Sequence, residues 1–158
     1  MQKSLQKLLL FLTVVTLCLP ANADVVKPAL VEVSVFSDRS TIVQIRTSVE
    51  ALLTGINGRY RNTQEAPNSE EYDRYRELGS DELKTVFEEF HSELLDGISL
   101  TVDGTKIPLS VGMVDVPPPG YTKVPRTSII ELVGEIPDRA TSLRWHYPLR
   151  FGDQAVRV

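Results

Sequence analysis

Acidic side chains are the most numerous groups in this chain that could take part in chemistry. Five of them gather in one short segment: Glu65, Glu70, Glu71, Asp73 and Glu77. A pair of carboxylates is what a glycosidase uses, one as the acid and the other as the base or nucleophile. Arg74 and Arg76 are interleaved with them, however, at the i,i+3 and i,i+4 spacings of ion pairs on a solvated helix. We therefore interpret the segment as a charged helix surface and expect no catalytic residue in it.

The chain has only two histidines, which leaves few ligands for a metal site built on imidazole. Glu88 and His91 have the i,i+3 spacing of di-iron helix bundles, but such sites need a second pair and two further glutamates. A histidine near a helix C-terminus is favoured by the helix dipole alone. His146 follows Trp145, and strand alternation would place the two side chains on opposite faces. We expect no metal ligand, no cofactor and no enzymatic activity.

One basic and aromatic cluster is a candidate contact surface. Arg59, Tyr60 and Arg61 are consecutive in a segment that is polar and irregular. Two guanidinium groups beside a phenol ring suit a phosphate or an anionic lipid head group. An ordinary exposed loop in an acidic protein is the alternative interpretation.

Composition and charge exclude several classes of function. The 158 residues are 42% hydrophobic, which is typical of a globular chain, and their length suits a single domain. The net charge is −4, whereas a nucleic-acid surface needs an excess of Lys and Arg. A single cysteine cannot form an intrachain disulfide.

The first 23 residues have the pattern of a secretory signal peptide. Lys3 and Lys7 precede an uncharged stretch, residues 8–19, which is too short to span a bilayer as a helix. Ala21 and Ala23 then give the small-residue pattern of a cleavage site, so Asp24 becomes the first residue of the mature chain. The 17 basic residues include Lys3 and Lys7, so the mature chain has 15 basic against 21 acidic residues, a net charge of −6. The leader lacks acidic residues, and we expect export to the bacterial periplasm.

The spacing of apolar residues changes along the chain, from the alternation of strands to the three- and four-residue spacing of helices. These elements must position the groups described above. Residues 30–36 alternate between apolar and polar side chains, and residues 41–47 form the second strand of a predicted hairpin. A helix follows from residue 48, with Ser48 as its cap. Two further helices are expected from Asn68 and Ser80, the first with Glu71 reaching back to its cap. The last helix carries the strongest apolar stripe: Leu83, Val86, Phe87, Phe90 and Leu94.

The rest of the chain has the pattern of short strands. Asp103-Gly104 favours a tight two-residue turn, and a stiff loop follows at residues 117–120. Strands are expected over residues 98–102, 106–116, 128–134, 142–147 and 151–158. The sequence therefore predicts a mainly β chain, an antiparallel immunoglobulin-like β-sandwich with an α-helical insertion at about residues 48–96. Residues 24–158 would form this single domain.

The last residues, 154–158, have the pattern of a strand that stops without a polar tail. Either this strand closes the sheet, or the sequence is a piece of a longer protein. We expect the second, a domain truncated at its C-terminus.

Four segments of the mature chain resemble one known family of membrane proteins. They are residues 24–33 (DVVKPALVEV), 98–104 (ISLTVDG), 119–126 (PGYTKVPR) and 145–153 (WHYPLRFGD). They are similar to the extracytoplasmic domain of HupE/UreJ-type proteins. The resemblance implies a non-catalytic periplasmic head, followed in an intact relative by transmembrane helices that carry the metal-handling residues. Some relatives begin the mature domain with histidine where this chain has Asp24, so the resemblance transfers no metal ligand.

Three functions from different classes follow. The first is the soluble head of such a membrane protein, an accessory to metal transport that contacts its own downstream transmembrane region or another membrane protein. It would be membrane-attached if the protein continues beyond Val158. The second is a free-standing periplasmic binding or adaptor protein. The third, which we consider weaker, is a hydrolase using the carboxylates around Glu70.

Overall fold

The computed structural model describes residues 24–122 and 124–158. Of the predicted cleavage site, Asp24 is therefore described, whereas Ala21 and Ala23 lie outside the described residues. Within the described residues, no helix is both long enough and apolar enough to cross a membrane.

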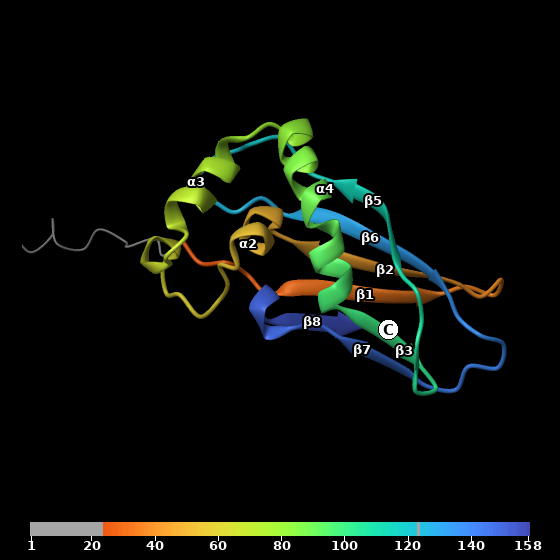
Figure 1. Ribbon diagram of the computed structural model, residues 1–158. Helices are drawn as coiled ribbons and strands as arrows, with labels where there is room; N and C mark the ends of the chain where they lie inside the picture. Colours follow the sequence, from red (N-terminus) through yellow and green to blue (C-terminus); the bar gives the residue numbers. More distant parts are fainter. Residues whose placement is uncertain (1–23, 123) are drawn as a thin grey trace, which may run out of the picture.

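Eight strands and three α-helices make up the described fold (Figure 1). The strands are β1 Ala29–Val35, β2 Ser40–Thr47, β3 Ser99–Val102, β4 Thr105–Lys106, β5 Ser110–Asp115, β6 Ser128–Glu135, β7 Leu143–His146 and β8 Gln154–Arg157. The helices are α2 Val49–Thr54, α3 Ser69–Glu77 and α4 Ser80–Gly97, with 3-10 turns η1 Thr63–Glu65 and η2 Leu149–Phe151. All three helices lie between β2 and β3 in the chain, where the helical insertion was predicted.

The strands form two sheets, so the chain is mainly β as predicted. One sheet has the order β5-β6-β2-β1-β8 and the other β4-β3-β7. Every pair is antiparallel except β1 with β8, which run parallel from the pairing of Ala29 with Gln154. The expectation of antiparallel pairing throughout was wrong at this edge. The reason is that η2 and Gly152, at a φ of 96°, replace a hairpin turn after β7 and redirect the chain onto β1.

The predicted strand over residues 106–116 is divided between the two sheets. β4 pairs with β3, whereas β5 pairs with β6 in the larger sheet. Pro108 stands between them and has no N–H to continue a ladder. The chain therefore crosses from one sheet to the other at this proline.

Alternation in β1 and β2 explains how the core is built. Val31 and Val33 of β1 and Val43 and Ile45 of β2 are buried, and the residues between them face outward. These side chains form one continuous core with the inward residues of β3 and β6 and with α4. Figure 1 shows α4 lying across β6, β2 and β1, so the helix covers the inner face of the larger sheet.

The apolar stripe of α4 docks on this core, but unevenly. Leu83, Phe87 and Leu94 are fully buried. Val86 and Phe90 are half-buried, and the ring of Phe90 contacts the ring of Phe151 with centroids 5.8 Å apart. Phe87 is therefore the aromatic anchor of the helix, and Phe90 seals its margin.

Two of the predicted helix caps were wrong. Gly79, not Ser80, is the N-cap of α4, and its N–H donates to the Glu82 carboxylate at 2.9 Å. Asn68 occupies the N-cap position of α3 but makes no capping bond there. Its amide instead donates to the carbonyl oxygen of Thr54 at 3.0 Å, which ties α3 to the end of α2.

The tight turn at Asp103-Gly104 is confirmed, because both residues have positive φ angles, 45° and 85°. The Asp103 carboxylate accepts hydrogen bonds from the N–H and hydroxyl groups of both Thr141 and Ser142. These bonds stabilise the charged form and lower the pKa of Asp103 below its ordinary value of 3.8. The turn is thereby fastened to the segment that precedes β7.

Truncation of Phe87 should be much more costly than truncation of Phe90. Phe87→Ala removes a fully buried ring, so the free energy of unfolding should fall by about 3–5 kcal/mol. Phe90→Ala should cost clearly less, because its ring is already partly in water. Urea denaturation followed by circular dichroism measures both. Equal losses would show that α4 is not anchored as described.

Candidate functional site

A carboxylate inside the protein organises the end of the fold where the helices meet the sheets. Glu50 lies in the first turn of α2 and is completely buried. Ser48, the N-cap of this helix, accepts from the Ala51 N–H at 3.2 Å and donates its hydroxyl to Glu50 at 2.8 Å. The other carboxylate oxygen of Glu50 accepts a hydrogen bond from the Nε–H group of Arg126. Both oxygens are therefore engaged, as a buried charge requires.

The partner of Glu50 connects three parts of the chain. Besides that ion pair, the Arg126 guanidinium donates to the carbonyl oxygen of Pro117 at 3.1 Å and to that of Tyr75 at 2.9 Å. Its side chain is only 7% exposed. Arg126 follows Pro125, and Pro117–Pro119 precede it; these prolines have no N–H, so the Arg126 side chain supplies a donor that their backbone lacks. A single arginine thus fastens the 117–127 loop to α2 and α3.

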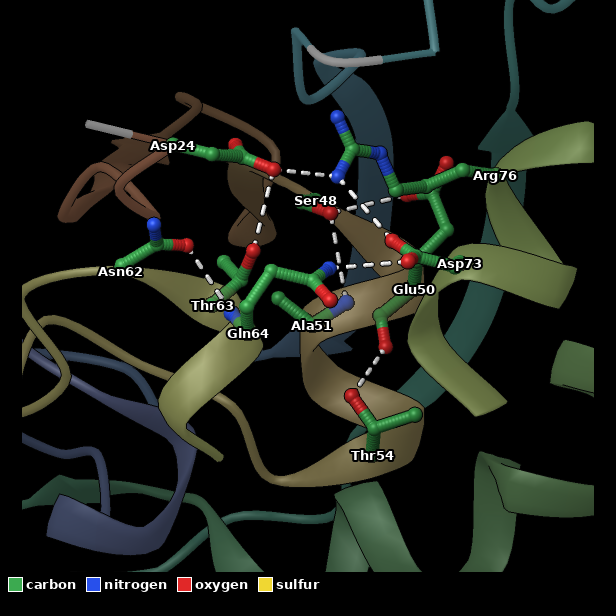
Figure 2. Close-up of polar contacts among 10 residues, drawn as sticks. All are labelled: Asp24, Ser48, Glu50, Ala51, Thr54, Asn62, Thr63, Gln64, Asp73 and Arg76. Atoms are coloured by element: carbon green, nitrogen blue, oxygen red, sulfur yellow. Dashed lines mark hydrogen bonds and ion pairs between the residues drawn. The ribbon is translucent and has the colours of Figure 1, made fainter. Parts of the chain in front are cut away.

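A second buried arginine holds the beginning of the described chain (Figure 2). Arg76 of α3, with a side chain only 4% exposed, donates to the Asp24 carboxylate. Thr63 also binds Asp24: the Thr63 hydroxyl donates to the Asp24 carboxylate at 3.0 Å, and the Thr63 N–H donates to the Asp24 carbonyl oxygen at 2.9 Å. The Arg76 guanidinium lies 4.9 Å from the ring centroid of Tyr72, and burial raises the pKa of Tyr72 to about 12. The residue predicted to begin the mature chain is thereby built into the fold.

The space around these buried charges is too small for a substrate. Arg76, Arg126 and Glu50 line a hollow of about 10 Å³, which is room for about one water molecule. Within the described residues, Nε and Nη2 of Arg76 and Oδ1 of Asp24 have no hydrogen-bond partner. A single water is the ligand that this space can accept.

A larger groove opens directly beside the Arg126 loop. It has a volume of about 260 Å³ and lies between the start of β1, the end of β2 and residues 124–127. Lys27, Leu30, Arg46 and Val124 are among its lining residues, and we call this the basic groove. Leu30 and Arg46 are paired directly across β1 and β2. Arg126 forms part of the lining and also holds the wall to which Val124 belongs.

The basic groove combines exposed apolar surface with uncompensated positive charge. Leu30 is 56% exposed and Val124 is 61% exposed. Among the residues that the structure describes, no carboxylate side chain lines the groove. Arg46 donates to the side-chain oxygen of Gln44 at 2.8 Å, and across the described chain neither Arg46 nor Lys27 forms an ion pair. This arrangement can attract an anionic group that carries an apolar part.

The predicted contact cluster lies elsewhere, in the turn after α2. Arg59 donates to Asn57 Oδ1 at 3.0 Å, and its guanidinium is 6.0 Å from the ring centroid of Tyr60. Tyr60 packs against a small apolar cluster, and Arg61 is exposed. None of the three lines the basic groove. The structure does not bring them to the surface that we identify as the candidate site.

The structure also describes the other candidate groups of the sequence analysis. Glu71 forms an exposed i,i+3 pair with Arg74 at 3.0 Å, in keeping with a charged helix surface. His91, which we expected at the surface near the end of its helix, is instead half-buried, because its ring packs edge-on against Phe87 with centroids 5.0 Å apart. Trp145 is half-buried and His146 is exposed, as alternation predicted. In residues 24–122 and 124–158, no three His, Cys, Asp or Glu side chains gather in a way that could hold a metal ion.

Sequence reasoning missed Glu50 and Arg126. One local signal existed, since Glu50 interrupts the apolar run Val49-Glu50-Ala51-Leu52, where a charged side chain must be paired if it is buried. The sequence near Glu50 does not indicate its partner, because Arg126 is 76 residues away along the chain. The basic groove was missed for the same reason, as its walls come from three distant segments.

Comparisons with protein-family models, with curated proteins and with solved structures found no match to this chain.

Loss of the buried Glu50 charge should strongly destabilise the fold. Glu50→Gln leaves the Arg126 guanidinium buried without a counter-charge, so the free energy of unfolding should fall by about 3–5 kcal/mol. Glu71→Gln is the matched control, because its pair with Arg74 is exposed and should be worth about 0–1 kcal/mol. Chemical denaturation measures both variants. If Glu50→Gln were as stable as the control, the ion pair would not be a structural constraint.

Proposed function

We propose that this chain is an exported, non-catalytic contact domain, the extracytoplasmic head of a HupE/UreJ-type membrane protein. It acts at the basic groove, through which it captures a partner or a substrate for the membrane-embedded part. We also propose that its two sheets form an immunoglobulin-like sandwich. The observation that carries the function is the groove, in which Lys27 and Arg46 remain without a counter-charge beside exposed Leu30 and Val124.

The use of the other charges supports this proposal. The side chains of Glu50, Arg76 and Arg126 are buried, that of Asp24 is partly buried, and all four are bound to one another or to the backbone, so they hold the fold together. Lys27 and Arg46 of the groove, by contrast, are exposed and form no ion pair within the described residues, and Arg46 donates to the side chain of Gln44. A surface of that kind suits reversible binding.

Two features support export. The leader pattern of residues 1–23 ends directly before Asp24. The fold binds Asp24 through Arg76 and Thr63, so a chain that begins at this residue keeps these contacts. Removal of the leader therefore costs the domain none of them.

Export should be visible when residues 1–158 are fused to alkaline phosphatase, which is active only outside the bacterial cytoplasm. We expect an active fusion whose N-terminal sequence, after processing, begins at Asp24. A fusion that lacks residues 1–23 should be inactive, and Ala23→Tyr should block cleavage because the peptidase needs a small residue there. An inactive fusion of the complete chain would contradict the proposed location.

The coding sequence beyond Val158 separates the head of a membrane protein from a free-standing binding protein. Several downstream apolar segments of about 20 residues each would support the membrane-protein head. A stop codon at position 159 would contradict it and favour the free-standing protein. Either result leaves the contact role of the groove to be tested by binding.

A further inference from the structure

The dimensions of the basic groove point to a small ligand. Its volume of about 260 Å³ lies just below the range of roughly 300–1,000 Å³ that is usual for small-molecule pockets. Pro28 and Pro125 line it together with Leu30 and Val124, so apolar surface dominates its walls. A short hydrocarbon chain is the kind of group that gains free energy by covering such surface.

The charges of the groove specify the other end of the ligand. Lys27 and Arg46 line the same hollow as Leu30, and its described lining contains no acidic side chain. A carboxylate placed between an ammonium and a guanidinium group can form charge-assisted hydrogen bonds with both. The chain as a whole is acidic, with a net charge of −4, so it should repel extended polyanionic surfaces such as nucleic acid or an anionic bilayer. A single carboxylate experiences mainly the local positive field.

Two other hollows of similar size contain acidic as well as basic side chains. One, of about 260 Å³ on the outer face of β8, β1 and β2, shares Leu30 and Arg46 with the basic groove but also contains Glu32 and Arg157, which pair with each other at 3.9 Å. The other, of about 220 Å³ between α4 and β5, contains Glu88 beside Lys84 and His91. Acidic and basic groups are mixed in both, whereas the charged residues described in the lining of the basic groove are all basic.

The walls of the groove are fixed before any ligand binds. Thr47 and Ser48 end β2 and cap α2, and Ser48 is bound to the buried Glu50. Arg126 anchors the opposite wall through its contacts with Glu50, Pro117 and Tyr75. Binding of a ligand therefore costs little conformational entropy of the walls, which favours binding even to a site of modest size.

We propose that the basic groove binds a single-chain amphiphilic carboxylate. The hydrocarbon chain lies against Leu30 and Val124, and the carboxylate binds Lys27 and Arg46. This assignment rests on the proposed function, because it identifies the kind of ligand that the contact domain captures.

Binding of sodium octanoate to the complete purified chain tests the proposal. Two-dimensional amide NMR should show saturable shifts at Lys27, Leu30, Arg46 and Val124. Acetate has the charge without the chain and octylammonium has the chain with the opposite charge, so both should bind at least tenfold more weakly. Equal binding of octylammonium would overturn the proposal, because the basic side chains would then contribute nothing.

Variants distinguish the groove from general surface adsorption. Lys27→Gln should weaken octanoate binding by roughly tenfold, the amount expected for one charge-assisted hydrogen bond, and Lys27 lines the basic groove but not the neighbouring hollow. Arg61→Gln removes an exposed arginine outside the groove and should leave the affinity unchanged. Leu30→Ser should weaken binding, whereas Leu149→Ser, at a residue 83% exposed elsewhere, should not. Equal effects within either pair would overturn the assignment to the groove.

Vesicle binding separates failure of this inference from failure of the proposed function. We expect no binding to phosphatidylglycerol vesicles under conditions in which octanoate binds. Vesicle binding that is lost in Lys27→Gln, without octanoate binding, would overturn the ligand assignment but leave the groove as a contact surface. Export of the alkaline phosphatase fusion is measured independently of both.

Discussion

A charge that is buried away from water must be met by an opposite charge, and in this protein that requirement falls on Glu50. The carboxylate is completely buried, and the Arg126 guanidinium and the Ser48 hydroxyl donate hydrogen bonds to its two oxygens. Desolvation of either ion alone would cost several kcal/mol, so the two must stay together. Arg126 also donates to the carbonyl oxygens of Tyr75 in α3 and of Pro117. The ion pair therefore fixes α2, α3 and the segment around Pro117 relative to one another.

The candidate site follows from that arrangement. The groove exists because the 117–127 loop is held against the ends of β1 and β2, which places Val124 opposite Leu30 and Arg46. The buried charges are used within the fold, while those of the groove remain available to solvent. This division underlies our proposal of a contact domain and of its ligand, a small group with one negative charge.

Local patterns predicted most of the elements but not how they meet. Alternation located β1, β2 and β6 to within about a residue or two, and the apolar stripe located α4, because these signals arise from which face each side chain buries. The parallel pairing of β8, the crossing at Pro108 and the pairing of Glu50 with Arg126 were not predicted. Each depends on residues far apart in the sequence, where a single chain carries no local signal of contact. The contact cluster at residues 59–61 was chosen from composition alone, and its arginines and tyrosine lie away from the groove.

A double-mutant cycle on Glu50 and Arg126 tests the central constraint most directly. The free energy of unfolding would be measured for the original chain, Glu50→Gln, Arg126→Gln and the double variant. If the pair is the constraint described here, the second substitution should cost much less once the first is present. The coupling free energy should then be about 1–3 kcal/mol. Additive effects, within about 0.5 kcal/mol, would contradict the account.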